Sequence, residues 1–418
     1  MDLLESLARP AAPRELALSA WAQIAAAPHR AGPILKATQR DARRIRSRQR
    51  RPLMEVLFDL VRHARRMEWK LGTDDPQTLW IGMLIRHGLD PATATAISGI
   101  DGPWDRLDDW DTPHPDPLRW LALRGGISDE ATPLVHDSLG DRAHPFFDAS
   151  DQRAPLCIRA NPAKATRTQL QHALAERSIA SEPGPWSTHG LVLHGRPQLD
   201  PLDLHRDGWF EVQDEGSQLL AELVQAQGTV VDLCAGAGGK TLAMATGART
   251  LHAADVRHRA LTRLKQRARR AGVRVTPHAL PPDGVLPRSL SSVRADRVLV
   301  DAPCSGMGVL RRDPHNRLRL NPSDLTQLCD LQARILDRAA TLVKPGGRLI
   351  YATCSVLRPE NDDAVSAFLQ RHPHFRLHPA DEVMRADVCD GAFLRVAPDT
   401  HGTDGFFGAV LVRQPPET

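Results

Sequence analysis

Apolar residues near the start of the chain recur at the spacing of a helix. Behind Pro52, which suits a first helical turn, one face is apolar at every third or fourth position: Leu53, Val56, Leu57, Leu60 and Val61. Pro76 marks a break between helices, and the proline-rich segment 111–120 (DTPHPDPLRW) is a longer break. Short helices are expected again over residues 117–145. The pattern predicts an all-α domain over residues 1–145.

The next stretch has a mixed pattern. Two short apolar runs, Leu156–Ala160 and Leu191–His194, each suit a strand. Between them, Thr166 and Gln169 stand at the spacing of a capping box, which predicts the start of a helix. Residues 146–205 are therefore expected to form a small α+β module.

From about residue 206 the chain alternates short apolar runs with helical stretches. Four runs each end at or beside a polar or reactive residue: Val230–Leu233, Leu251–Asp255, Val298–Asp301 and Leu349–Thr353. Residues 260–271, between the second and third runs, have helical spacing. Strands that alternate with helices predict a parallel, doubly wound α/β sheet over residues 206–418. Ligands of such sheets bind beyond the carboxyl ends of the strands.

Composition narrows the class of protein. The 418 residues are 41% hydrophobic and 25% charged, which is typical of globular proteins with large cores. No apolar stretch is long enough to span a membrane, and the first residues lack the pattern of a secretory signal, so a cytoplasmic protein is expected. The six cysteines form no CxxC pair, which argues against a disulfide framework and against a metal site.

Positive charge is concentrated in two segments of the chain, although the net charge is small. The formal net charge is only +4, but residues 40–51 read RDARRIRSRQRR and residues 257–274 carry eight arginines or lysines. Clustered cations attract the phosphates of nucleic acids. Solvated helix faces, or an arginine-rich genome, would explain the same clusters, so charge leaves both interpretations open.

The strongest local signal is a glycine-rich turn after the first strand of the sheet, Val230–Thr241 (VVDLCAGAGGKT). A phosphate loop would need glycine where Cys234 stands, and a dinucleotide loop would need glycine where Thr241 stands. An S-adenosylmethionine turn fits better, with Asp255 at the end of the next strand to accept hydrogen bonds from ribose hydroxyls. A plain tight turn is the alternative.

Two cysteines follow predicted strands of the sheet. Cys304 lies in Asp301-Ala302-Pro303-Cys304-Ser305-Gly306, and Cys354 lies in Tyr351-Ala352-Thr353-Cys354-Ser355. A buried cysteine is usually only a small apolar residue. Two thiols at the edge that holds the glycine turn also suit methylation of pyrimidine C5, because a thiolate that adds to C6 makes C5 nucleophilic. In that chemistry Asp301 is placed to contact the N3 edge of the base.

These motifs resemble a known family. DLCAGAGGKT, VLVDAPCSGMGVLRRDP and LIYATCSVLRPEND are similar to signature motifs of the bacterial RNA cytosine-C5 methyltransferases, the ribosomal RNA methylase B (Nol/Nop/Sun) group. WFEVQDEGSQL (Trp209–Leu219) and DGFFGAVL (Asp404–Leu411) resemble flanking elements of the same family. The resemblance covers about residues 150–418, in the order of the family.

The resemblance implies a Rossmann-like S-adenosylmethionine-dependent methyltransferase with RNA, most simply ribosomal RNA, as its partner. A monomer is expected, although the sequence itself gives no oligomeric state. Cys354 would be the nucleophile, Cys304 would help to break the Cys354–base adduct, and Asp301 would lie beside base and cofactor. The implied cofactor residues are Cys234, Ala235, Gly236, Ala237, Gly238, Gly239, Lys240, Asp255, Asp283 and Asp301. Asp283, in PPDG, is the least certain of these, because a turn aspartate would look the same.

Some positions depart from the family pattern. The glycine loop lacks the usual proline, and His315 follows Pro314 where the family tends to have aspartate, so any substrate contact made by that acid is in doubt. The helical pattern before residue 140 resembles a NusB-like RNA-binding domain, with residues 40–51 facing RNA. Two alternatives remain: an amino-group methylase, which would usually show Asn/Asp-Pro-Pro-aromatic at the fourth strand, and an RNA-binding ribosome-assembly factor with a decayed catalytic domain.

Overall fold

The structure is a computed structural model that describes residues 3–415. The chain forms two compact units. The first takes residues up to Asp151 together with Leu310–Asp324, and the second takes Gln152–Val309 together with the chain from Leu325. Residues 310–324 fall within the range that the sequence assigns to the catalytic domain, but they pack with the helical unit. The fully buried Arg317 ties them there, since it donates hydrogen bonds to the Arg62 carbonyl and, at 3.0 Å, to Asp151.

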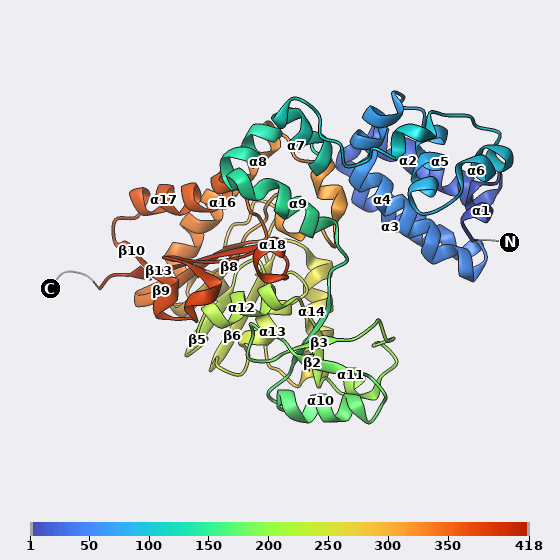
Figure 1. The fold of residues 1–418 in the computed structure, drawn as a ribbon. Helices are drawn as coiled ribbons and strands as arrows, with labels where there is room; N and C mark the ends of the chain where they lie inside the picture. Colours follow the sequence, from blue (N-terminus) through green and yellow to red (C-terminus); the bar gives the residue numbers. More distant parts are fainter. Residues whose placement is uncertain (1–2, 416–418) are drawn as a thin grey trace. The chain divides into compact units, whose positions relative to one another are not determined.

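The described part of the first unit is built from helices joined by turns (Figure 1). The helices are α1 (Leu3–Ala8), α2 (Ala12–Ala26), α3 (Ala31–Asp41), α4 (Ser47–Leu71), α5 (Pro76–Arg86), α6 (Pro91–Ser98), α7 (Pro117–Gly125), α8 (Thr132–Leu139) and α9 (Ala143–Asp151). The short helices predicted over residues 117–145 are therefore confirmed as α7, α8 and the start of α9. Pro76 is confirmed as a break, because it opens α5 directly after the capping residue Asp75.

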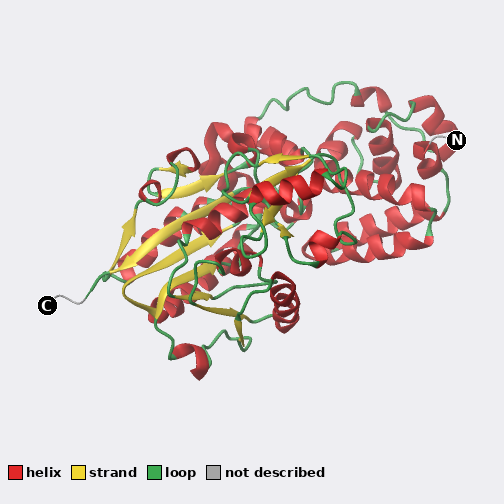
Figure 2. Cartoon of the chain, turned by 90° about the horizontal axis from the view of Figure 1, so that it is seen from below, coloured by secondary structure: helices red, strands yellow, loops and turns green. Residues whose placement is uncertain are grey.

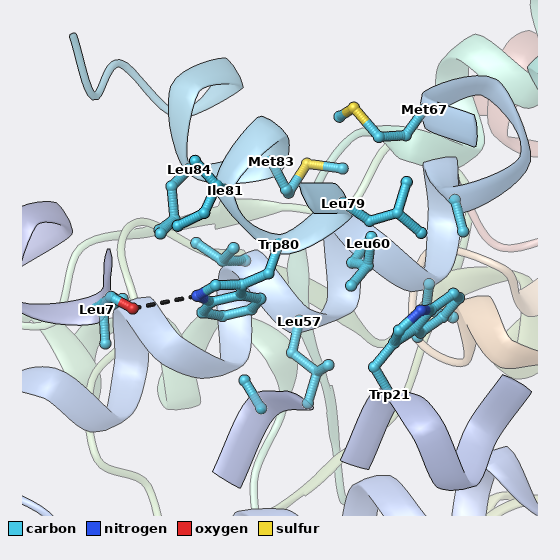
Figure 3. Close-up of a cluster of buried hydrophobic side chains, with 14 of the residues drawn as sticks. Leu7, Trp21, Leu57, Leu60, Met67, Leu79, Trp80, Ile81, Met83 and Leu84 are labelled. Carbon is cyan, nitrogen blue, oxygen red and sulfur yellow. Dashed lines mark hydrogen bonds between the residues drawn. The ribbon is translucent and has the colours of Figure 1, made fainter. Parts of the chain in front are cut away.

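The core of this unit gathers around α4 and α5. Leu57 and Leu60 of α4 are fully buried, as the apolar spacing predicted, and they lie beside Trp80 of α5 (Figure 3). The Trp80 indole N–H donates to the Leu7 carbonyl at 3.1 Å, so its one polar atom is satisfied inside the core.

The prediction that Pro52 begins a helix is wrong. α4 already begins at Ser47, and Pro52 lies inside it. The side chain of Arg50 stabilises the preceding turn, because its Nε donates to the Ile45 carbonyl at 3.1 Å.

The second unit begins with a small antiparallel sheet of order β2-β3-β1-β4. Its strands are β1 (Leu156–Ala160), β2 (Ser181–Pro183), β3 (Gly190–Leu193) and β4 (Phe210–Val212), and its helices are α10 (Arg167–Ala175) and α11 (Asp203–Arg206). Thr166 and Gln169 form the predicted capping box at the start of α10. Both predicted strands are present, although the second is shifted by one residue.

The remaining strands of this unit form a nine-stranded mixed sheet. Figure 2 shows all strands in yellow. The order of the nine-stranded sheet is β11-β12-β13-β9-β8-β5-β6-β7, and β10 pairs with β13. The strands are β5 (Thr229–Asp232), β6 (Thr250–Asp255), β7 (Thr276–Ala279), β8 (Ala295–Asp301), β9 (Val343–Thr353), β10 (Phe375–His378), β11 (Cys389–Asp390), β12 (Phe393–Val396) and β13 (Phe406–Arg413). The four predicted strands are β5, β6, β8 and β9, which run parallel, whereas β13 pairs antiparallel with β9.

Helices accompany the strands of this sheet: α12 (Glu215–Leu223), α13 (Gly239–Met244), α14 (His258–Ala271), α15 (Arg288–Ser291), α16 (Pro322–Leu342), α17 (Asp362–Arg371) and α18 (Pro398–His401). Successive residues of β8 enter different cores, because side chains alternate across a sheet. Val298 and Val300 pack with residues of α16 and α17, whereas Leu299 packs with residues of α12. Burial on both sides explains why the parallel strands read as continuous apolar runs.

Candidate functional site

A cavity of about 620 Å³ lies at the carboxyl ends of β5, β6 and β8. That volume suits a small-molecule or cofactor site. Its lining includes nearly all the residues singled out from the sequence: Cys234, Ala235, Gly236, Ala237, Gly239, Lys240, Asp255, Asp283, Asp301, Cys304 and Cys354. Gly238 is the exception. It has φ 87°, and a Cβ added there would meet Leu264 Cγ at 2.7 Å, so it packs against α14 instead.

The glycine turn presents its backbone to this cavity. Gly236 has φ 54°, a conformation that other residues rarely adopt. A side chain at Gly239 would meet no atom within 4 Å, so the backbone there is open to close approach by a ligand. The turn is held from both sides, because Asp255 Oδ2 accepts the Gly236 N–H at 2.7 Å and Arg267 donates to the Ala237 carbonyl at 2.8 Å.

Asp255 ends β6 and faces the cavity as a charged acceptor. Burial alone would raise the pKa of this carboxyl, but the hydrogen bonds from Arg257 and from the Gly236 N–H lower it. Arg257 Nε lies 3.1 Å from Asp255 Oδ1, and its own side chain is 69% exposed. Asp255 is therefore ionised and held in place at the spot where ribose hydroxyls were expected.

Asp232 is a buried acid that was not among the predicted cofactor residues, although it lies in the glycine-turn motif. It lines the cavity and is 1% exposed, and burial raises its pKa to about 7. Thr241 donates to its Oδ2 at 2.6 Å, whereas Oδ1 has no hydrogen-bond partner within residues 3–415. A buried oxygen without a partner beside a cavity marks a place where a ligand donor would be accommodated.

Lys240 and Asp301 form an ion pair inside the cavity, with Nζ and Oδ2 2.8 Å apart. Burial alone would lower the pKa of Lys240, but the charge and hydrogen bond of Asp301 outweigh this and raise it. The ammonium group also lies 5.4 Å from the ring of Phe406. Lys240 is thus a fixed cation that touches the acid at the end of β8.

The two strand-end thiols meet. Cys304 Sγ and Cys354 Sγ are 3.3 Å apart, and either can be the hydrogen-bond donor. The hydrogen bond with Cys354 and burial raise the pKa of Cys304, and the charge of Glu360 adds to the effect. Burial also raises the pKa of Cys234. Cys157, Cys329 and Cys389 do not line this cavity.

The loop after β7 closes another wall of the cavity. Asp283 lines it, and its Oδ1 accepts the Val285 N–H at 3.0 Å, as in an ordinary turn. Ser217, Arg257 and Arg338 also line the cavity and were not predicted. Arg338 lies on α16, outside every motif, so only the packing of that helix reveals it.

Within residues 3–415, no group of three or more His, Cys, Asp or Glu side chains is placed to hold a metal ion. None of the described helices is long and apolar enough to cross a membrane.

Comparison with known proteins adds to this geometry. Residues 219–412 match the family described as 16S rRNA methyltransferase RsmB/F, and residues 134–200 match the ferredoxin-like domain described as Methyltr_RsmF/B-like. The ribosomal RNA small subunit methyltransferase B of Serratia proteamaculans (strain 568) is 34% identical over 273 residues, which are 64% of this chain and 62% of that protein.

Two solved structures share the fold. The "Crystal Structure of PH0851" superimposes with a TM-score of 0.71 at 25% identity, over 91% of this chain and 94% of that one. A methyltransferase homologue from Pyrococcus horikoshii gives 0.61 at 24% identity, over 71% of this chain and 99% of that one. The predicted α/β methyltransferase fold with a helical N-terminal region is confirmed.

The motif resemblance is confirmed as well. The chain spans about three fifths of the length of the first curated relative. The family match over residues 219–412 includes the glycine turn and both thiols. Two RsmB/F-type family models together account for residues 134–200 and 219–412. Over these two ranges the chain is therefore similar to the RsmB/F methyltransferase family.

Proposed function

We propose that this protein methylates C5 of cytosine in RNA, with S-adenosylmethionine as methyl donor and ribosomal RNA as the substrate class. One observation carries the proposal: two thiols 3.3 Å apart lie at the edge of a cofactor-sized cavity. Ribosomal RNA is favoured because the curated relative is named a ribosomal RNA small subunit methyltransferase.

The residues present fit this cofactor. The open backbone at Gly239 leaves room for a ligand, Asp255 supplies carboxylate acceptors for hydroxyl groups, and Asp232 offers an unpartnered oxygen. Asp283 and the turn residues that line the cavity complete the proposed binding set, and these turn residues are Cys234–Ala237, Gly239 and Lys240. S-adenosylmethionine supplies an electrophilic methyl group on a sulfonium when it is bound there.

Cys354 acts as the nucleophile in the proposed reaction. Cytosine C5 is a poor nucleophile, and addition of the Cys354 thiolate to C6 turns the ring into an enamine that is nucleophilic at C5. After C5 is alkylated, its proton passes to water and the electrons of that C–H bond form the C5–C6 double bond. The Cys354–C6 bond breaks at the same time and its electron pair returns to sulfur, which restores the aromatic ring and the thiolate. The covalent adduct divides one difficult step into easier ones.

Two other residues that line the cavity, Asp301 and Cys304, are proposed to have further roles in the reaction. Asp301 is proposed to contact the N3 edge of the base, and the Lys240 ammonium holds its carboxylate in place at 2.8 Å. Cys304, whose raised pKa keeps it protonated, is proposed to assist release of the Cys354–base adduct.

The RNA must present an unstacked base, because a paired cytosine cannot reach the thiol. The outer face of α14 supports an RNA partner. Four of its side chains are exposed and form no hydrogen bond or ion pair with any residue of the described chain: Arg259, Arg263, Lys265 and Arg269. The helix carries no acidic residue, so this face attracts phosphate.

The domain organisation enters the same proposal. Residues 1–145 are proposed as a NusB-like RNA-binding domain, residues 146–205 as an RNA-binding α+β module, and residues 206–418 as the catalytic domain. The first two would hold the RNA around the target by phosphate and shape contacts.

Substitution of each thiol tests the proposed function. Cys304→Ala is expected to accumulate a covalent protein–RNA adduct on denaturing gels with labelled RNA, and Cys354→Ala is expected to form none. Cys389→Ala is the matched control, because this cysteine lies outside the cavity. An adduct in Cys354→Ala but not in Cys304→Ala would make Cys304 the nucleophile. Bisulfite sequencing of RNA from cells with and without the gene identifies the cytosine, and no difference at any position would contradict the proposal.

A further inference from the structure

A buried polar network connects the two loops that carry the thiols. Glu360 and Asn361 are fully buried, and neither lines the cavity. They follow β9 within the LRPEND motif, and none of the roles assigned above uses them. Buried polar groups of this kind are usually kept satisfied by the groups that they hold in place.

Glu360 holds the loop of Cys304. Its Oε1 accepts the Ser305 N–H at 2.8 Å, and its Oε2 accepts the Ser305 hydroxyl at 2.5 Å. Gln332 of α16 donates both to Glu360 Oε1, at 3.0 Å, and to the Pro303 carbonyl, at 2.9 Å. The carboxylate and the amide thus fix the residues on both sides of Cys304.

Asn361 holds the loop of Cys354 in the same way. Its Oδ1 accepts the Thr353 hydroxyl at 2.6 Å, and its Nδ2 donates to the Ser355 carbonyl at 3.0 Å. The two loops are also joined directly, because the hydroxyls of Ser305 and Ser355 lie 3.1 Å apart. Two adjacent residues therefore fix the residues that flank both thiols.

We propose that Glu360 and Asn361 are positioning residues that hold the Cys304 and Cys354 thiols in register. The geometric part rests on the hydrogen bonds above. The consequence for catalysis rests on the proposed function, because it assumes that Cys354 reacts as a thiolate beside a protonated Cys304.

The charge of Glu360 has a direct chemical effect. The hydrogen bond with Cys354 and burial raise the pKa of Cys304, and the negative charges of Cys354 and Glu360 raise it further. A second anion at Cys304 is therefore disfavoured while Glu360 is ionised. Loss of this charge makes Cys304 easier to deprotonate, whereas loss of the Ser305 hydroxyl alone does not.

The test uses the full chain without RNA or cofactor, so it does not depend on methylation. The pH dependence of iodoacetamide alkylation at Cys304 is measured by peptide mass spectrometry. Glu360→Gln keeps the shape of the side chain but removes its charge, and it is expected to shift the inflection to lower pH by about one unit. Ser305→Ala and the control Glu222→Gln, which changes a half-buried carboxyl bonded to the Thr188 N–H, are expected to leave it in place.

A second variant keeps the test decisive if Glu360→Gln folds poorly. Glu360→Asp retains the charge, so its inflection is expected near that of the unchanged protein. An unchanged inflection in Glu360→Gln, or an equally lowered one in Glu360→Asp, would overturn the electrostatic role.

The positioning role is tested in the methylation assay. Asn361→Ala is expected to lower kcat at least tenfold while KM for S-adenosylmethionine stays the same, because Asn361 touches the thiol loops and not the cavity. A change in that KM alone would contradict positioning. Absence of methylation by the unchanged protein would defeat the proposed function and leave the alkylation result standing.

Discussion

Helix α14 carries two classes of basic residue, and they should respond differently to substitution. Arg259, Arg263, Lys265 and Arg269 are exposed, with side chains unpaired within the described chain. Arg267 instead bonds the buried Glu211, with its Nη2 2.9 Å from Oε2. If the exposed set binds phosphates, each contact releases counterions and contributes about 0.7 to the slope of log affinity against log salt for single-stranded RNA.

The quadruple variant with glutamine at these four positions should therefore bind RNA with a slope shallower by about 2.8. Between 50 and 200 mM salt, the affinity of the unchanged protein should fall about 50-fold more than that of the variant. Fluorescence anisotropy of labelled RNA over this salt range measures both slopes.

Arg267→Gln provides the matched control on the same helix. It should keep the salt slope but lower the free energy of unfolding by about 1–3 kcal/mol, because the buried Glu211 carboxylate loses the two hydrogen bonds that Arg267 donates to it. Denaturant titration followed by circular dichroism measures this loss. Equal salt slopes for the quadruple variant and the unchanged protein would refute α14 as a phosphate-binding face.

Three further outcomes are expected. The stability of Asp232→Asn relative to the unchanged protein should rise between about pH 4 and 7 and stay constant above that. The raised folded-state pKa of Asp232 means that its ionisation destabilises the unchanged protein over this range. Denaturant unfolding measures the difference in unfolding free energy, and a difference that is independent of pH would contradict this. Asp255→Asn should weaken S-adenosylmethionine binding about 10- to 100-fold, because one or two charged hydrogen bonds are lost. Calorimetry measures this affinity, and an unchanged value would show that Asp255 is not part of the cofactor site. Leu336→Ala, at a fully buried position of α16 against the sheet, should cost about 2–5 kcal/mol in denaturant unfolding, and a loss under 1 kcal/mol would mean that this core is loosely packed.

Much of the site could be predicted because it follows from the polarity of parallel strands. Asp255, Asp301 and Cys354 each come at or directly after the end of a short apolar run, and parallel strands bring such ends to one edge of the sheet. The strand β7 was harder to predict, because Thr276–Ala279 has only one buried side chain, that of His278, and does not form an apolar run. Pro52 misled for a local reason: the turn before it is held by the side chain of Arg50, which periodicity does not register.

The sequence by itself determined the order of the elements, the glycine turn and the two strand-end thiols, because periodicity and backbone chemistry are local properties of the chain. Only the tertiary structure decided which groups meet: Cys304 with Cys354, Lys240 with Asp301, and Glu360 with Ser305. Each of these pairs joins residues at least 50 positions apart. The reason is physical: burial and hydrogen bonding depend on how sheet and helices pack in three dimensions, and no local pattern encodes the partner of a buried polar atom.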